Sequence, residues 1–191
     1  MPLLKRGPPR KSGGDYLTRT GRATEMHDVE QLSVGRASEG DAAGITKLYL
    51  ASRTDALPYL HRVHTDPEVY AWISDVVLKR RETWVGRLKG DIVGFMVLVS
   101  DELDQLYVLP EHYRSGIGRK LLDLAKTRSP ARLHLYTFQR NVRARAFYEA
   151  QGFRIIDMND GTRNEEKEPD ICYEWTPTQE SSTCEIPFAK G

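Results

Sequence analysis

A short apolar strand, a glycine-containing loop and an amphipathic helix follow one another without a spacer in residues 106–122, which read LYVLPEHYRSGIGRKLL. Gly116 and Gly118 leave the backbone bare around the first turn of this helix. Such a turn directs unpaired N–H groups outward, and the helix dipole adds partial positive charge. The segment therefore predicts either an anion site, most naturally for a phosphate or pyrophosphate, or a tight strand-to-helix turn without a ligand.

Two common phosphate-binding motifs do not fit this segment. A Walker loop requires GK[ST] after four intervening residues, and the sequence has no such run. A dinucleotide-binding fingerprint requires a third glycine at position 121, where Leu121 stands.

The periodicity of the remaining sequence predicts an α/β domain. Helical patterns begin at Asp41, which looks like an N-cap, and at Asp66-Pro67, and they recur over residues 116–128 and 142–151. Extended patterns cover residues 33–37, 83–88, 92–100, 103–108, 133–138, 153–158 and 171–175. This order predicts a single mixed, mostly antiparallel sheet of six to seven strands, flanked by helices on both faces.

The length of 191 residues suits one domain with tails. Residues 1–22 hold six basic residues against one acidic residue, a net charge of +5, so we expect a disordered basic tail over residues 1–30. The domain is expected over residues 31–177, followed by a C-terminal tail over residues 178–191. The chain as a whole has a formal net charge of +1, which argues against a polybasic nucleic-acid binder.

The sequence also limits the compartment and the partners. No apolar run approaches the roughly 20 residues of a membrane helix, and no hydrophobic secretory segment is present. Cys172 and Cys184 form neither a disulfide framework nor a CxxC metal motif. We therefore expect a cytoplasmic protein, a monomer or a homodimer, without a metal, a nucleic-acid partner or membrane contact.

Two segments resemble motifs of the GCN5-related N-acetyltransferase (GNAT) family. Residues 106–122 are similar to its acyl-CoA-binding motif, Q/R-x-x-G-x-G/A, and residues 141–153, NVRARAFYEAQGF, are similar to its N-x-x-A-x-x-F-Y-x-x-x-G-F pattern. The two matches occur in the expected order, and the resemblance covers the chain from about Ser33 to Thr176. One departure is Tyr113, which stands where the family has Gln or Arg, with Arg114 one residue later.

The resemblance implies the GNAT-like acyl-CoA N-acyltransferase fold, with a sheet that splays between the strands at 103–108 and 133–138. It also implies that the divergence starts at a bulge and that the pantetheine arm of acetyl-CoA, the co-substrate, fills the gap. The residues implied to bind acetyl-CoA are Leu106, Tyr107 and Val108 on the strand, Arg114, Ser115, Gly116, Ile117, Gly118 and Arg119 around the pyrophosphate, and Asn141.

Acyl transfer to an amine needs an oxyanion site, a proton for the departing sulfur and a group that accepts the amine proton. The resemblance gives the first role to backbone N–H near Val108, and the second to Tyr148, which is otherwise a core aromatic beside Phe147. Asp104 is the candidate base ahead of Glu102, which looks like a turn residue; an ordinary exposed carboxylate or a water chain are the alternatives. No cysteine lies in the motifs and no G-x-S-x-G elbow is present, so we expect direct attack in a ternary complex.

The motifs say less about which residues line the pocket for the acceptor amine. In this family the loop that joins the first two helices lines it, which points to Tyr59, His61 and His64 or, alternatively, to a solvated loop. An acidic loop with Glu165, Glu166 and Asp170 either steers a cationic amine or is simply solvated. We expect an N-acetyltransferase for a primary amine of a small molecule, because nothing marks a peptide groove. The alternatives are a protein or peptide amine and a non-catalytic acyl-CoA sensor.

Overall fold

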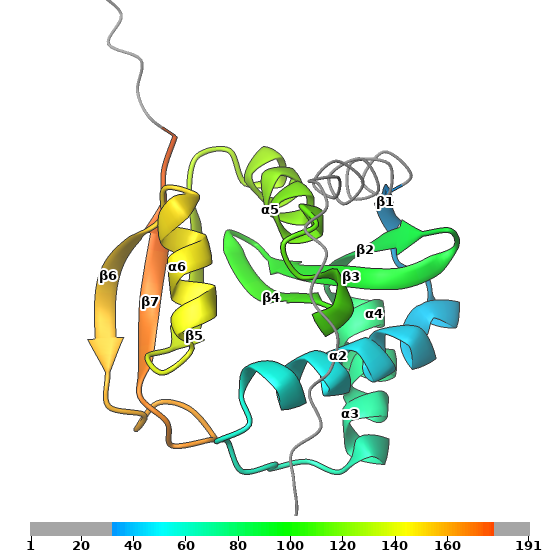
Figure 1. Ribbon diagram of the computed structural model, residues 1–191, viewed down its shortest axis with the longest axis horizontal. Coiled ribbons are helices and arrows are strands. Elements are labelled where there is room, and N and C mark those ends of the chain that lie inside the picture. Colours follow the sequence, from blue (N-terminus) through cyan, green and yellow to red (C-terminus); the bar gives the residue numbers. More distant parts are fainter. Residues whose placement is uncertain (1–31, 178–191) are drawn as a thin grey trace, which may run out of the picture.

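The computed structural model of the protein describes residues 32–177, so the tails predicted over residues 1–30 and 178–191 lie outside the described residues. The described chain forms one seven-stranded sheet in which only β4 and β5 are parallel, and this confirms the predicted mixed sheet (Figure 1). In spatial order, its strands are β1 (Ser33–Arg36), β2 (Glu82–Leu88), β3 (Asp91–Val99), β4 (Glu102–Val108), β5 (Leu133–Phe138), β7 (Asp170–Trp175) and β6 (Arg154–Asn159).

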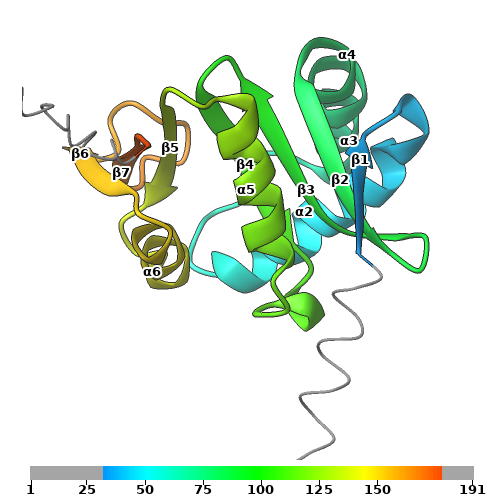
Figure 2. The same cartoon turned by 90° about the horizontal axis from the view of Figure 1, so that it is seen from above.

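Helices cover both faces of the sheet (Figures 1 and 2). Alternate residues of β3 point to opposite faces, so Phe95 packs in one core and Met96 in the other. The Phe95 face carries α2 (Ala42–Ala56), α3 (Asp66–Trp72), a π-helical turn (Ile73–Val77) and α4 (Leu78–Arg80), and the Met96 face carries α5 (Ile117–Arg128) and α6 (Val142–Ala150). None of the helices within residues 32–177 combines the length and the apolar run needed to cross a membrane.

Local sequence rules explain how α3 begins, whereas the start of α2 follows them only in part. Thr65 and Glu68 form a capping box at the start of α3, where Pro67 occupies the first turn. Asp41 occupies the N-cap position of α2 as predicted, but its carboxylate does not cap that helix. It instead accepts hydrogen bonds from Ser38 and pairs with Arg87 on β2 at 2.7 Å, which ties the turn before α2 to the sheet.

Strands β2, β3 and β4 form an antiparallel meander, and its last strand borders the gap in the sheet. A two-residue turn, Lys89-Gly90, joins β2 to β3, and a second tight turn leads into β4. The register between β3 and β4 shifts at Asp104, which is the extra residue of a β-bulge. Beyond this meander, β4 meets β5 at one recorded residue pair, Glu102 with His134, and the two strands then diverge.

The position of α5 over the sheet depends on a glycine in β3. A Cβ built on Gly94 would lie 2.8 Å from Cγ2 of Ile117, 3.1 Å from Cδ1 of Leu121 and 3.3 Å from the carbonyl oxygen of Tyr107. Only a residue without a side chain lets the first turns of α5 lie this close to β3 and β4. Gly94 therefore fixes where the N-terminus of α5 stands.

We predict that Gly94→Ala lowers the free energy of unfolding by about 1–3 kcal/mol, because the new methyl group forces α5 away from the sheet. Urea denaturation followed by circular dichroism measures this change. Gly35→Ala on β1 is the matched control, since a Cβ there meets nothing within 4 Å, and its effect should stay within about 0.5 kcal/mol. Equal effects of the two substitutions would contradict the close-approach argument.

Candidate active site

A cavity lies where β4 and β5 diverge. Its walls come from both strands, from the C-terminal end of α2 and from the start of α6, and its lining includes Leu106, Tyr107, Asn141 and Tyr148. The structure thus brings together four predicted site residues from two motifs that are about thirty positions apart in the chain.

Backbone polarity along β4 determines which amides face this gap. Leu109 donates its N–H to the carbonyl of Val93 at 2.9 Å, toward β3. Because N–H directions alternate along a strand, the N–H of Val108 points to the other side, toward β5. The same alternation turns the amide of Tyr107 toward β3 and that of Leu106 toward the gap. Ser52 on α2 donates to the carbonyl oxygen of Val108 at 2.7 Å and holds this end of the strand.

The N-terminus of α5 presents a second set of free amides. Gly116 is left-handed (φ +88°) at the N-cap position, and Arg114 is left-handed as well (φ +63°). The first intrahelical bond runs from Lys120 N–H to Gly116 at 3.0 Å, so the N–H groups of Ile117, Gly118 and Arg119 precede the helical ladder. These amides and the helix dipole make this turn a site for an anion.

The side chains of residues 114–119, at the start of α5, differ in burial and in contacts. The side chain of Ile117 is buried against the sheet, and Ser115 donates to the carbonyl of His112 at 2.6 Å, so both hold the loop in shape. Arg114 and Arg119 are exposed beside the free amides, and Arg119 also lies 3.8 Å from Asp123. The loop therefore offers backbone donors at its centre and positive charge at its rim.

Tyr148 lines the gap from α6 and is 8% exposed. Its ring contacts those of Phe147 and Phe153, with centroids 5.2 and 5.6 Å away, so it belongs to the core as well as to the site. Burial raises the pKa of the Tyr148 hydroxyl, and the nearby Tyr107 adds to this effect. The phenol therefore stays protonated, as a proton donor requires.

Asn141 begins α6 beside the same gap. Its side-chain oxygen accepts a hydrogen bond from the N–H of Ala144 at 3.2 Å, which makes it the N-cap of the helix. Since Oδ1 serves the cap, Nδ2 is the atom with which Asn141 could donate to a ligand.

Asp104 stands between the gap and a second cavity, and it lines both. Arg81 and Gln105 both donate to its Oδ2, so Oδ1 is the oxygen that could accept a proton from an amine. Glu102 is the first residue of β4, so its interpretation as a turn residue is wrong. Burial, and next the charge of Asp104, raise the pKa of Glu102.

The second cavity has a volume of about 830 Å³ and lies between α2, the loop of residues 57–65, α3, the start of β4 and the loop that joins β6 to β7. Tyr49 and Trp72 pack together on one side, with ring centroids 5.8 Å apart. An arginine guanidinium lies over each of these rings: that of Arg53 is 5.8 Å from the Tyr49 centroid, and that of Arg81 is 5.9 Å from the Trp72 centroid.

Polar contacts join the walls of this acceptor-side cavity. Arg53 pairs with Glu166 across the cavity, and His64 Nε2 lies 3.0 Å from Glu165 Oε2. Glu165, Glu166, His61 and His64 line the cavity, as expected. The expectation is wrong for Tyr59, which is not among the lining residues and instead stacks against Arg140, whose guanidinium is 3.9 Å from its ring centroid.

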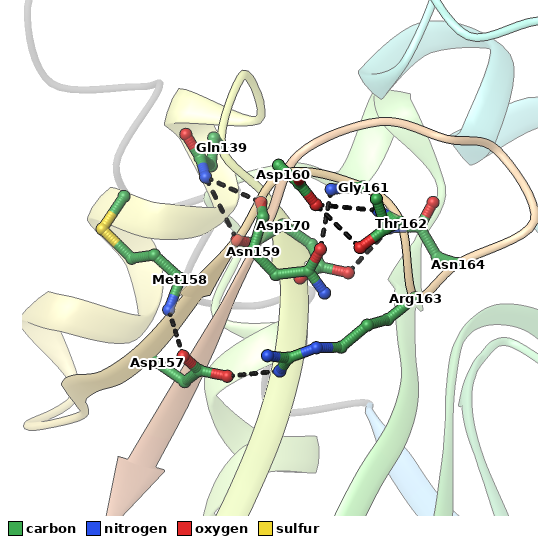
Figure 3. Close-up of polar contacts among 10 residues, drawn as sticks. All are labelled: Gln139, Asp157, Met158, Asn159, Asp160, Gly161, Thr162, Arg163, Asn164 and Asp170. Carbon is green, nitrogen blue, oxygen red and sulfur yellow. Dashed lines mark hydrogen bonds and ion pairs between the residues drawn. The ribbon is translucent and has the colours of Figure 1, made fainter.

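The loop that carries Glu165 and Glu166 is held by its own polar network, shown in Figure 3. Gln139 donates to the carbonyls of Asn159 and Asp170, and Asn164 donates to the Asp170 carboxylate at 2.7 Å. Asp170 is therefore buried inside the base of the loop, where its carboxylate accepts the hydrogen bond from Asn164. At Gly161 (φ +92°) a Cβ would lie 2.6 Å from the backbone of Lys167, so the loop folds tightly on itself. Glu165 and Arg163 are nevertheless 72% and 68% exposed, so steering of an amine and a solvated charge run both stay predictions for this loop.

No pattern in the sequence indicates the roles of Arg53 and Arg81. Arg53 finds its partner 113 positions away in Glu166, and Arg81 finds Asp104 23 positions away on the bulge. A pattern of alternating apolar residues carries no information on such long-range pairs.

A family model described as an acetyltransferase (GNAT) domain matches residues 79–155, which include β2 to β5, α5 and α6. The peptidyl-lysine N-acetyltransferase YiaC of Escherichia coli K12 is 30% identical over 125 residues, or 65% of this chain and 84% of the relative. The peptidyl-lysine N-acetyltransferase YjaB of Salmonella typhimurium is 35% identical over 68 residues, or 36% of this chain and 46% of the relative.

Solved structures share the fold at lower identity. Apo-form YjaB from Escherichia coli has a TM-score of 0.64 and 21% identity, and the match covers 75% of this chain and 97% of that one. The yncA protein of Salmonella typhimurium, described with its cofactor acetyl-CoA, has a TM-score of 0.59 and 16% identity, with 82% and 99% covered. These likenesses concern the fold and confirm the predicted architecture.

We predict that Tyr148 does not ionise in the folded protein up to about pH 11, because burial raises its pKa above that of a free phenol. The rise in tyrosinate absorbance on alkaline titration should then be the same for the wild type and Tyr148→Phe. In concentrated urea the variant should lack one titrating phenol, which serves as the control. A difference between the folded proteins below this pH would contradict the burial of the hydroxyl.

Proposed function

The chain belongs to the GNAT family of acetyltransferases, and we propose that it transfers the acetyl group of acetyl-CoA to a primary amine in the acceptor-side cavity. The observation that carries this proposal is the divergence of β4 from β5 beside the bare N-terminus of α5. An extended, amide-bearing arm fits between two strand edges whose polar groups need partners, and a diphosphate fits the free amides at the helix start. Acetyl-CoA carries both groups in this order.

The reaction requires that a C–N bond forms while the C–S bond of the thioester breaks. The N–H of Val108 points into the gap, where it would stabilise the negative charge that develops on the carbonyl oxygen. Tyr148 would donate its proton to the departing sulfur. The amine loses a proton as it attacks, and Oδ1 of Asp104 would accept it, directly or through water. The two motif segments, residues 106–122 and 141–153, contain no cysteine, which supports direct attack within a ternary complex over a covalent intermediate.

The two cavities meet at the place where the reacting atoms must meet. Leu57, Asp104 and Gln105 line both of them. An amine in the larger cavity therefore approaches the gap past Asp104, from the face of the sheet opposite to α5. Separate entrances for the donor and the acceptor are what a ternary complex needs.

The kind of amine is supported by two different observations. The Arg53–Glu166 ion pair and the His64–Glu165 contact connect α2 and the loop of residues 57–65 to the β6–β7 loop, so they bound the larger cavity, which favours a small molecule. Relatives named as peptidyl-lysine N-acetyltransferases favour a lysine side chain of a protein as the second candidate. Both acceptors present a primary amine, so the chemistry at Asp104 and Tyr148 is the same.

The direct test is release of CoA thiol from acetyl-CoA with purified full-length protein. One arm supplies a panel of small primary amines, and the other supplies lysine-containing peptides and folded proteins. We expect amine-dependent thiol release and N-acetylated product by mass spectrometry in at least one arm. Binding of CoA without turnover in both arms would favour a non-catalytic sensor instead.

We predict that Tyr148→Phe lowers kcat by about 10–100-fold, because the variant keeps the ring in the core but cannot protonate the sulfur. The affinity for acetyl-CoA, measured by calorimetry, should change little. Tyr173→Phe is a suitable control, since Tyr173 is buried in the same core and its hydroxyl bonds to Glu149 instead. An unchanged kcat for Tyr148→Phe would remove this residue from the mechanism.

A further inference from the structure

Three side chains from three separate elements meet beside the β4–β5 gap. Arg143 on α6 pairs with Asp55 on α2, with 2.9 Å between Nη1 and Oδ2. The same guanidinium lies 4.6 Å from the ring centroid of Tyr113, in the loop before α5. We call Asp55, Tyr113 and Arg143 the mouth bridge.

The neighbours of these residues place the mouth bridge at the gap. Asp55 precedes Ala56 and Leu57, which line the gap, and Arg143 lies between Asn141 and Ala144, which line it as well. Tyr113 lies three residues before Gly116, where the free amides of α5 begin. The mouth bridge therefore connects α2, α6 and the loop before α5 beside the gap, although none of its three residues lines the gap itself.

The bond between Arg143 and Asp55 is suited to exchange. The two side chains are 59% and 42% exposed, and ion pairs with such exposure contribute little to stability. Arg143 is also held independently of Asp55, because its planar guanidinium lies against the Tyr113 ring. Burial, and then the charge of Asp55, raise the pKa of Tyr113, so its hydroxyl stays neutral beside the carboxylate.

Tyr113 itself brings no positive charge to the anion site. Arg143 brings one to the same place from α6, and it currently faces a carboxylate. Phosphate and carboxylate oxygens are recognised by a guanidinium in the same bidentate way. The arrangement resembles a phosphate-binding arginine whose position is occupied by an internal anion.

We propose that Arg143 is a donor-binding residue that releases Asp55 and binds a phosphate group of acetyl-CoA while it stays stacked on Tyr113, and that Asp55 competes with this phosphate. This inference rests on the proposed function. Asp55 then lowers the affinity for every donor that needs Arg143, and a pantetheine thioester without phosphates cannot benefit from the exchange.

Calorimetry on the full chain tests the exchange with CoA and with pantetheine as probes. Arg143→Gln should weaken CoA binding by about 5–20-fold, as expected for loss of one partly exposed charge-assisted bond. Asp55→Asn should tighten CoA binding by about 2–5-fold, because Arg143 then has no ion pair to break before it binds a phosphate. In the Arg143→Gln background the effect of Asp55→Asn should shrink, and pantetheine binding should not respond to any of these substitutions.

Arg140→Gln is the matched control. Arg140 also stacks on a tyrosine, Tyr59, and lies 3.7 Å from a carboxylate of Glu168, but these partners belong to the loop of residues 57–65 and the β6–β7 loop rather than to the loop before α5. The Arg140→Gln variant should therefore bind CoA with the affinity of the wild type. If Arg140→Gln and Arg143→Gln weaken binding equally, the effect is one of net charge, and the proposal is wrong.

The remaining outcomes are also decisive. Unchanged or weaker CoA binding in Asp55→Asn would overturn the competition, and this variant keeps the test valid even if Arg143→Gln unfolds, which thermal denaturation would detect. Equal CoA affinity in all variants would overturn the exchange and leave the proposed function intact. No CoA binding to the wild-type chain would overturn the proposed function together with the inference.

Discussion

The separation of β4 from β5 after one residue pair is the constraint on which the site depends. Strand edges carry backbone N–H and C=O groups that cannot be buried without partners. Here those groups face a cavity lined by Leu106, Asn141 and Tyr148, so an extended ligand with its own amides can complete the sheet. The bulge at Asp104 lies at the start of this divergence, and it places a carboxylate where the two cavities meet.

The two faces of the sheet provide different electrostatic surroundings. On the face with α5, positive character comes from backbone amides and a helix dipole, which need no counter-charge from the protein. On the face with α2, charges occur as pairs: Arg53 with Glu166, and Arg81 with Asp104. An anion is therefore favoured on the first face. On the second face, the carboxylate of an existing ion pair can exchange its arginine for the amine of a ligand.

Local patterns determined the elements, and distant contacts determined the site. The strand over residues 133–138 has the predicted bounds, and the helices of both motifs begin and end within one residue of their predicted limits, because apolar periodicity and glycine positions are local properties. The directions of loop side chains are not local. Tyr59 turns to Arg140 and Asp170 turns to Asn164, and neither partner could be inferred from spacing. The bulge at Asp104 likewise depends on the register with β3, which no strand sets alone.

Tyr113 illustrates the difference between a motif read in sequence and the same motif in space. Read position by position, a tyrosine at the family's Gln or Arg position removes an amide or guanidinium donor from the loop. In three dimensions the aromatic face supports the guanidinium of Arg143 from another helix, thirty residues later in the chain. An aromatic ring suits this task because a flat, weakly hydrated cation can lie on it and still direct its N–H groups sideways. The tyrosine therefore adds a guanidinium from a second element to the charges of Arg114 and Arg119 in the loop.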